Sequence, residues 1–162
     1  MENSKVWNKD YCKEVIDYFC NEQVMENYSS HNRKYKRNLL FERDKGNNWV
    51  WKSVDKLIKS NLGENYFLST WLIGLRYDKN DFFTEHRDGE GTANRYLSGG
   101  IELSEENSYE GGIYVLKGSK SRSKQGELFT HDPYVLHEIT KVTEGTRYSL
   151  HFCIGKKPDT LI

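Results

Sequence analysis

The sequence predicts a mainly β domain, a barrel or a sandwich, with helices at its N-terminal end. Two stretches before residue 65 place apolar residues at helical spacing. From residue 66 onward, short β-branched and aromatic runs alternate with Gly, Asn and Asp, the pattern of consecutive strands. A chain of 162 residues is long enough for one domain with its own core. We therefore expect a single domain, 1–162, with a helical support region at 1–65 and a β core at 66–157.

Two helices are predicted in the support region. The first covers 8–23, NKDYCKEVIDYFCNEQ, with Asn8 as its N-cap. The second covers 48–63, NWVWKSVDKLIKSNLG, and Gly63 is placed to end it. We expect their apolar residues to pack on one face of the β core: Tyr11, Val15, Ile16, Phe19, Trp51, Val54, Leu57 and Ile58.

Six short runs are predicted strands because they are rich in β-branched and aromatic residues and are bounded by turn residues. They lie at 66–77, 95–103, 111–118, 126–132, 134–142 and 146–155. The basic segment KGSKSRSKQG, residues 117–126, is expected to form an exposed hairpin or loop.

Charge and composition limit the classes of partner. The 24 basic and 24 acidic residues cancel, so there is no overall attraction to nucleic acid or to a membrane surface. A basic cluster at 33–45 is interpreted as a solvated face, with docking of an acidic partner as the alternative. Three irregularly spaced cysteines, and the lack of an apolar leader or a membrane-length stretch, indicate a soluble, cytoplasmic protein with reduced thiols. The oligomeric state is left open.

A candidate metal site begins at FFTEHRDGEG, residues 82–91, where His86 and Asp88 are one residue apart. Residues i and i+2 of an extended chain point to the same side, so both side chains can reach one ion. His137, in the apolar run YVLHEITKV, is the best candidate for a third ligand. Two histidines and one carboxylate on one face of an octahedron leave positions open for substrate and O₂, as in non-heme Fe(II) oxygenases. The alternatives are a polar turn and a hydrogen-bonded buried histidine.

Arg147 lies in the predicted strand TRYSLHFCIG, where a buried guanidinium needs a partner. Its planar fork suits a carboxylate, and Ser149 shares its face of the strand. Both can bind the distal carboxylate of a co-substrate whose other end chelates the metal, and 2-oxoglutarate is such a molecule. Alternatively, Arg147 pairs with a structural glutamate such as Glu138 or Glu144.

From about residue 71 to 155, the chain resembles the 2-oxoglutarate/Fe(II)-dependent dioxygenases, most closely their prolyl 4-hydroxylase-like branch. Three segments carry the resemblance: LRYDKNDFFTEHRD, NRYLSGGIELSEENSYEGG and GELFTHDPYVLHEITKVTEGTRYSLHF. The resemblance implies a double-stranded β-helix (jelly roll) core supported by the N-terminal helices. It also implies Fe(II) as cofactor, with 2-oxoglutarate and O₂ as co-substrates and ascorbate as a candidate reductant.

The resemblance assigns roles to single positions. The matched residues are His86, Asp88 and His137 for iron, Arg147, Ser149 and Tyr77 for 2-oxoglutarate, and Arg95 for the substrate groove. Strand alternation adds His151, either beside the iron or co-substrate or as a hydrogen-bonded core residue. His131 is expected in a turn and His31 on the surface.

Three features depart from the family pattern, and the first is that DKND, between Tyr77 and His86, lacks the usual Gly. Glu102 stands where many members have an aromatic residue near the co-substrate carboxylate. Two carboxylates would repel each other, so either Glu102 points away or the alignment is shifted by one residue. Gly99 and Gly100 replace bulky residues, and they either widen the pocket or mark a bulge.

The functional hypothesis is C–H hydroxylation coupled to oxidative decarboxylation of 2-oxoglutarate, acting on a peptidyl amino acid such as proline. A free amino acid or another small metabolite is the second substrate class. A non-catalytic jelly-roll module that binds a metal or ligand is the third hypothesis. Oxidation of a nucleobase ranks last, because the related repair oxygenases carry a second C-terminal arginine and RYSLHFCIG has only Arg147.

Overall fold

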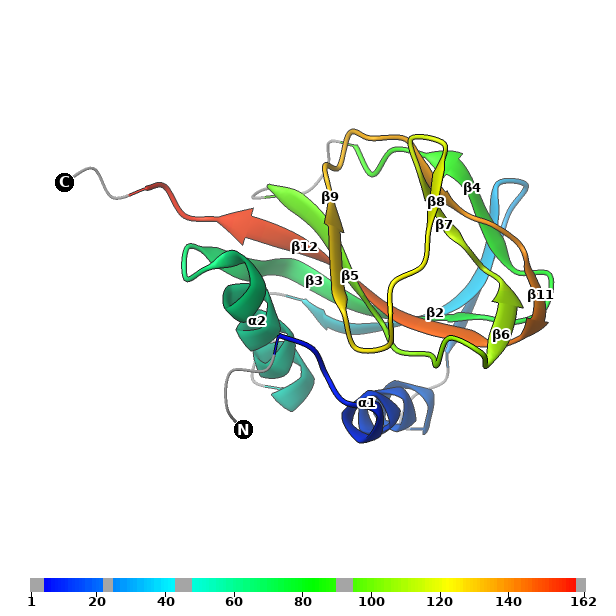
Figure 1. Ribbon diagram of the computed structural model, residues 1–162, viewed down its shortest axis with the longest axis horizontal. Helices are drawn as coiled ribbons and strands as arrows, with labels where there is room; N and C mark the ends of the chain where they lie inside the picture. Colours follow the sequence, from blue (N-terminus) through cyan, green and yellow to red (C-terminus); the bar gives the residue numbers. More distant parts are fainter. Residues whose placement is uncertain (1–4, 22–24, 43–47, 90–94, 160–162) are drawn as a thin grey trace.

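A computed structural model describes residues 5–21, 25–42, 48–89 and 95–159 of the chain, and it shows a curled antiparallel sheet with two helices against one outer face (Figure 1). Both predicted helices are confirmed, as α1 (Lys9–Asn21) and α2 (Trp49–Leu62). Asn8 caps α1 by accepting a 2.8 Å hydrogen bond from the Tyr11 amide. Gly63, with a φ of 109°, ends α2. Neither helix is long and apolar enough to cross a membrane.

Each of the six predicted runs contains a strand. The strands are β1 (Glu26–Ser29), β2 (Arg33–Glu42), β3 (Tyr66–Tyr77), β4 (Phe82–His86), β5 (Leu97–Glu102), β6 (Tyr109–Gly111), β7 (Tyr114–Leu116), β8 (Ser119–Ser121), β9 (Leu128–His131), β10 (His137–Ile139), β11 (Val142–Gly145) and β12 (Arg147–Lys156). The exposed hairpin predicted at 117–126 is confirmed. It joins β7 to β8 through Lys117 and Gly118, whose φ values of 50° and 77° suit a two-residue turn.

Region 1–65, predicted as a helical support region, is not helical throughout. It also contains β1 and β2, and β2 pairs with both β3 and β4 inside the main sheet. The basic cluster therefore lies largely on a strand. Of the β2 side chains that the structure describes, at 33–39, those of Tyr35 and Asn38 are buried. Because Lys and Arg occupy most positions around them, the apolar alternation typical of a strand is absent from the sequence.

The main sheet has the strand order β8-β7-β10-β4-β2-β3-β12-β5-β9, and β11 pairs separately with β6. The sheet curls until its two ends meet. Tyr114 of β7 contacts Phe129 and His131 of β9 at ring-centroid distances of 5.4 and 5.8 Å. β7 and β9 share no backbone pairing, so side chains close the barrel at this place. The prediction of a mainly β domain with a jelly-roll core is confirmed.

The two faces of the sheet serve different purposes because successive residues of a strand point to opposite sides. Leu150 and Phe152 of β12 are fully buried against the helices. Arg147, Ser149 and His151, which alternate with them, line the cavity inside the curled sheet. One strand thus supplies both the helix-facing core and the wall of the candidate site.

Gly99 and Gly100 neither widen the pocket nor mark a bulge, which were the two expectations for them. They lie in a regular stretch of pairing between β5 and β12 without a register shift, so they mark no bulge. A Cβ on Gly100 would lie 2.3 Å from Cζ of Phe129, and a Cβ on Gly99 would lie 2.7 Å from Cε2 of Phe152. Aromatic rings fill the space on both faces, so the glycines do not widen the pocket.

We predict that Phe19→Ala lowers the free energy of unfolding by about 3–5 kcal/mol, since it empties a site at the helix–sheet interface. Phe19 is fully buried, and its ring packs directly on Gly74. The packing is so close that a Cβ on Gly74 would lie only 2.7 Å from Cγ of Phe19. Urea unfolding measures the change. Leu39→Ala, at a side chain that is 49% exposed, is the control and should change stability by less than about 0.5 kcal/mol. Equal effects of the two substitutions would contradict this packing.

Candidate metal centre and adjoining cavity

Strand pairing brings the two candidate histidine ligands together. β10 pairs with β4, and His137 lies directly opposite His86 in the register. Their ring centroids are 4.2 Å apart. Asp88 follows two residues after His86, just beyond the end of β4, so it reaches the same point. The juxtaposition therefore depends on one antiparallel pairing and on the short spacing of the His-x-Asp motif.

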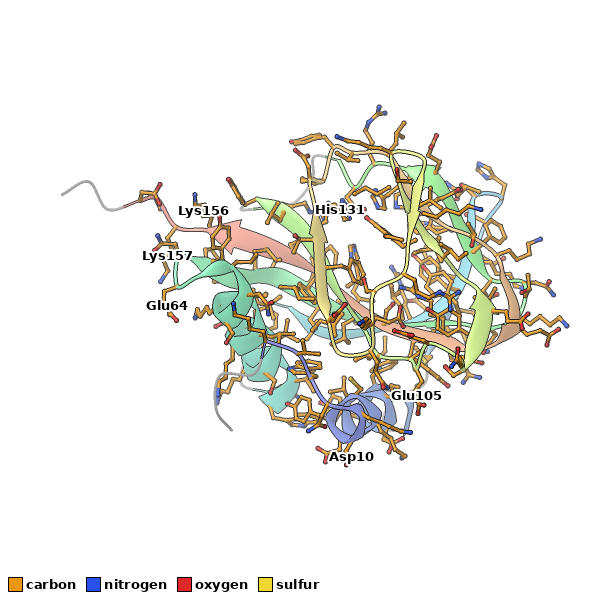
Figure 2. The ribbon with its side chains drawn as sticks, viewed as in Figure 1. Asp10, Glu64, Glu105, His131, Lys156 and Lys157 are labelled. Carbon is orange, nitrogen blue, oxygen red and sulfur yellow. The ribbon has the colours of Figure 1, made fainter. Side chains whose placement is uncertain are left out.

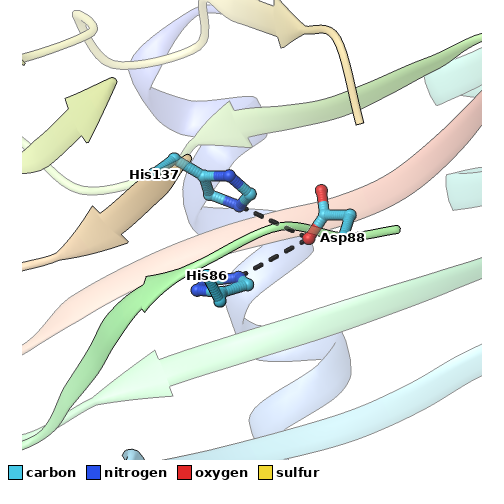
Figure 3. Close-up of side chains that lie close together, drawn as sticks. All are labelled: His86, Asp88 and His137. Carbon is cyan, nitrogen blue, oxygen red and sulfur yellow. Dashed lines mark ion pairs between the residues drawn. The ribbon is translucent and has the colours of Figure 1, made fainter. Parts of the chain in front are cut away.

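The three ligand atoms converge, as Figure 3 shows. Oδ1 of Asp88 lies 3.5 Å from Nε2 of His86 and 3.3 Å from Nε2 of His137. One ligand atom from each residue lies within 4.8 Å of the others. This spacing suits three ligands around one ion.

Both imidazole rings are oriented by backbone carbonyls. Nδ1 of His86 lies 2.7 Å from the Thr84 carbonyl oxygen, and Nδ1 of His137 lies 2.9 Å from that of Val135. A carbonyl accepts hydrogen bonds only, so Nδ1 carries a proton, and in the neutral ring the lone pair of Nε2 is then available to a metal. Two lone pairs and a carboxylate directed at one point make a site that favours a cation.

Asp88 is held from its other side as well. Ser98 Oγ donates a 2.5 Å hydrogen bond to Asp88 Oδ2, and Arg95 Nη1 donates to the Asp88 carbonyl at 3.1 Å. Burial alone would raise the pKa of the Asp88 carboxyl, but the contacts with His137 and His86 hold that pKa well below its usual range. Asp88 is therefore an ionised carboxylate held in place beside the two imidazoles, which suits a metal ligand.

His131 is not the turn residue predicted from the sequence. It lies at the end of β9 and is buried (Figure 2). Its Nε2 is 3.5 Å from Asp88 Oδ2, and its ring centroid is 4.2 Å from that of His137. Burial lowers the pKa of the His131 imidazole. The signal that would have revealed it is the alternation with Phe129, which points to the same face. His31 is exposed, as expected.

Arg147, Ser149 and Tyr77 line the same cavity as the metal-site residues. Tyr77 and Arg147 are direct partners in the β3–β12 register, and Arg147 Cζ lies 5.7 Å from the centroid of the Tyr77 ring. Ile73, Leu75 and Phe83 contribute apolar side chains to the lining of this cavity. The cavity thus contains the candidate metal site and, in addition, a buried arginine.

Arg147 is paired with neither Glu138 nor Glu144. Its Nε donates to Oε2 of Glu102 at 2.9 Å, and both side chains are only 4% exposed. The expectation that Glu102 points away is therefore wrong. Glu102 lies opposite Ser149 in an unbroken pairing of β5 with β12. Burial raises the pKa of Glu102, and the charge of Arg147 opposes that shift.

Arg95 and His151 lie next to the metal site. Besides the Asp88 carbonyl, Arg95 contacts the Cys153 thiol, with Nε 3.1 Å from Sγ, and the face of Trp71. His151 also packs on Trp71, at a ring-centroid distance of 5.1 Å, and its Nδ1 lies 3.1 Å from the Gly99 carbonyl oxygen. Burial lowers the pKa of His151 to about 4, so its ring is neutral at pH 7.

Tyr114 is a further cavity residue that the sequence did not single out. Its ring lies among those of Phe129, His131 and His137. Its hydroxyl is buried and makes no hydrogen bond within the described part of the chain. An unpaired buried hydroxyl costs free energy, so this group is suited to bind a ligand in the cavity.

No family model and no curated protein matches this sequence. Solved structures do match the fold. A prolyl-4-hydroxylase from Pseudomonas putida gives a TM-score of 0.70 at 16% identity, covering 94% of this chain and 89% of that one. A prolyl hydroxylase from Trichoplax adhaerens, in complex with a hypoxia inducible factor peptide fragment, gives 0.65 at 16% identity, covering 91% and 78%. The non-heme alpha ketoglutarate dependent epimerase SnoN gives 0.69 at 12% identity, covering 97% and 80%. The resemblance to this branch is thus confirmed at the level of the fold.

We predict that His137→Ala weakens Fe(II) binding by more than about 100-fold, because it removes one of three converging ligands. Anaerobic calorimetric titration with Fe(II) measures the change. The matched control is His31→Ala, which removes an exposed histidine and should bind Fe(II) like the native protein. Unchanged affinity in His137→Ala would show that the metal site lies elsewhere.

Ser98→Ala should weaken Fe(II) binding by about 10–100-fold, because Asp88 loses the hydrogen bond that fixes its second oxygen. The same titration applies. Ser121→Ala, on the fully exposed strand β8, is the control for loss of a serine hydroxyl. If both variants bind Fe(II) like the native protein, Ser98 has no part in orienting Asp88.

Proposed function

We propose that this protein is an Fe(II)-dependent oxygenase that couples oxidative decarboxylation of a 2-oxo acid to hydroxylation of a C–H bond. The resemblance makes 2-oxoglutarate the expected acid. One observation carries the proposal: Nε2 of His86, Nε2 of His137 and the Asp88 carboxylate converge in the same cavity that Arg147 lines. The fold shared with prolyl hydroxylases supports it.

His86, Asp88 and His137 would hold Fe(II) on one face and leave the positions toward the cavity open. When bound, the iron supplies the oxidation: O₂ gives one oxygen atom to the substrate and one to succinate, and 2-oxoglutarate loses CO₂. The chain itself binds, orients and excludes water. Thr84 and Val135 carbonyls fix the rings, Ser98 fixes the carboxylate, and the apolar wall keeps bulk water from the reacting end.

Arg147, Ser149 and Tyr77 are the proposed binding groups for the distal end of the 2-oxo acid. Arg147 and Ser149 are 3% and 2% exposed, and Tyr77 is 1% exposed, so all three face the interior. Arg95 remains a candidate for the substrate groove, although its described contacts are with Asp88, Cys153 and Trp71. His151 remains a candidate beside the iron.

For the hydroxylated substrate, we propose a peptidyl amino acid such as proline. Support comes from two of the similar structures, which are prolyl hydroxylases, one of them holding a peptide. A small molecule is the second proposed class of substrate, because another similar structure is an epimerase from nogalamycin biosynthesis. Stimulation of 2-oxo acid decarboxylation by proline-containing peptides, but not by free amino acids, would favour the first class, and the reverse would favour the second.

We predict that the native protein converts 2-oxoglutarate at millimolar concentration to succinate under air, with Fe(II) and ascorbate, and that His86→Ala does not. The reason is that His86 supplies one of the three ligand atoms that converge in the cluster found among the described residues. Succinate formation and O₂ uptake are measured with and without Fe(II), and His31→Ala serves as the control. Fe(II) binding without decarboxylation of any 2-oxo acid, even with peptides present, would instead indicate a non-catalytic metal-binding module.

A further inference from the structure

Among the described residues that line the cavity, both arginines already have a carboxylate partner. Arg147 Nε lies 2.9 Å from Glu102 Oε2, and Arg37 Nε lies 2.9 Å from Glu26 Oε2. The surroundings of the two pairs differ. The Arg37 and Glu26 side chains are 33% and 64% exposed, so water screens them, whereas those of Arg147 and Glu102 are each 4% exposed. Only the Arg147–Glu102 pair is buried deeply enough for its charges to interact at low dielectric.

Glu102 is held in place by contacts of its own. Its Oε1 accepts a 3.1 Å hydrogen bond from the Ser104 amide, and its Oε2 accepts one from the Tyr109 hydroxyl at 3.4 Å in addition to that from Arg147. The register opposite Ser149 directs both side chains to the inner face of the sheet. Glu102 therefore cannot leave Arg147 without breaking a set of buried hydrogen bonds.

The distal carboxylate of 2-oxoglutarate would have to share the Arg147 guanidinium with Glu102. The net charge of this buried pair is zero, so the incoming charge would lose its water without gaining an unpaired cation. An uncharged distal group has no such cost. It would meet the remaining guanidinium nitrogens and the hydroxyls of Tyr77 and Ser149, which can all form hydrogen bonds.

We infer that Glu102 determines the co-substrate specificity of this cavity. With Arg147 committed to Glu102, the site favours a 2-oxo monocarboxylic acid with an uncharged distal end over 2-oxoglutarate. The inference rests on the proposed function, because it concerns the acid that the same metal site would bind.

The test compares two ligands on the Fe(II)-loaded protein under anaerobic conditions: 2-oxoglutarate and its 5-methyl ester, which lacks the distal charge. Calorimetric titration gives the affinity of each for the native protein and for Glu102→Gln. Glutamine keeps the size and an acceptor for Arg147 Nε but removes the negative charge. The matched control is Glu144→Gln, at a surface residue whose side chain is 64% exposed and paired with Lys79.

We expect Glu102→Gln to shift the affinity ratio toward 2-oxoglutarate by about tenfold or more, and Glu144→Gln to leave it unchanged. A smaller shift in Glu102→Gln would overturn the inference while the proposed function stands. If neither acid binds any Fe(II)-loaded variant, the proposed function itself fails. Should Glu102→Gln not fold, the native protein decides alone: tighter binding of the ester supports the inference, and tighter binding of 2-oxoglutarate overturns it.

Discussion

The antiparallel pairing of β12 between β3 and β5 is the interaction on which the rest of the structure depends. It runs from Arg147 to Lys156, and its register determines which residues face the helices and which face the cavity. A slip of one residue would send Arg147 and Ser149 outward and bring Leu150 and Phe152 into the cavity. Burial of Leu150 and Phe152 against α1 and α2 therefore also fixes Arg147 and Ser149 on the cavity side. The same register thus specifies both the packing of the core and the geometry of the candidate site.

Much of this arrangement could be predicted because the relevant signals are local. Asn8 and Gly63 mark helix ends, and the runs that became β3 and β12 are dense in β-forming residues. The proximity of His86, Asp88 and His137 followed from motif spacing and family resemblance, and geometry agrees with it. β2 was missed because Lys and Arg mask its buried positions. The partner of Arg147 was missed because it is set by a register between β5 and β12 that no local pattern reveals.

The cavity contains two charge centres with different surroundings. The Asp88 carboxylate faces Nε2 of His86 and Nε2 of His137 at 3.5 and 3.3 Å, and the three ligand atoms converge on a point that suits a cation. Arg147 is matched within the chain by Glu102. The candidate metal site and the Arg147–Glu102 pair therefore favour different ligands: the first suits a cation, and the second, as inferred above, suits a neutral polar group.

The closure of the curled sheet has a consequence for motion. Where β7 meets β9, the described contacts are between aromatic and imidazole rings, with Tyr114 against Phe129 and His131. Separating β7 from β9 would part these rings without breaking a β-ladder hydrogen bond, because the described residues of the two strands form no backbone pairing. Because His131 adjoins Asp88 and Tyr114 adjoins His137, the part of the barrel that is closed by side chains alone lies beside the candidate metal site.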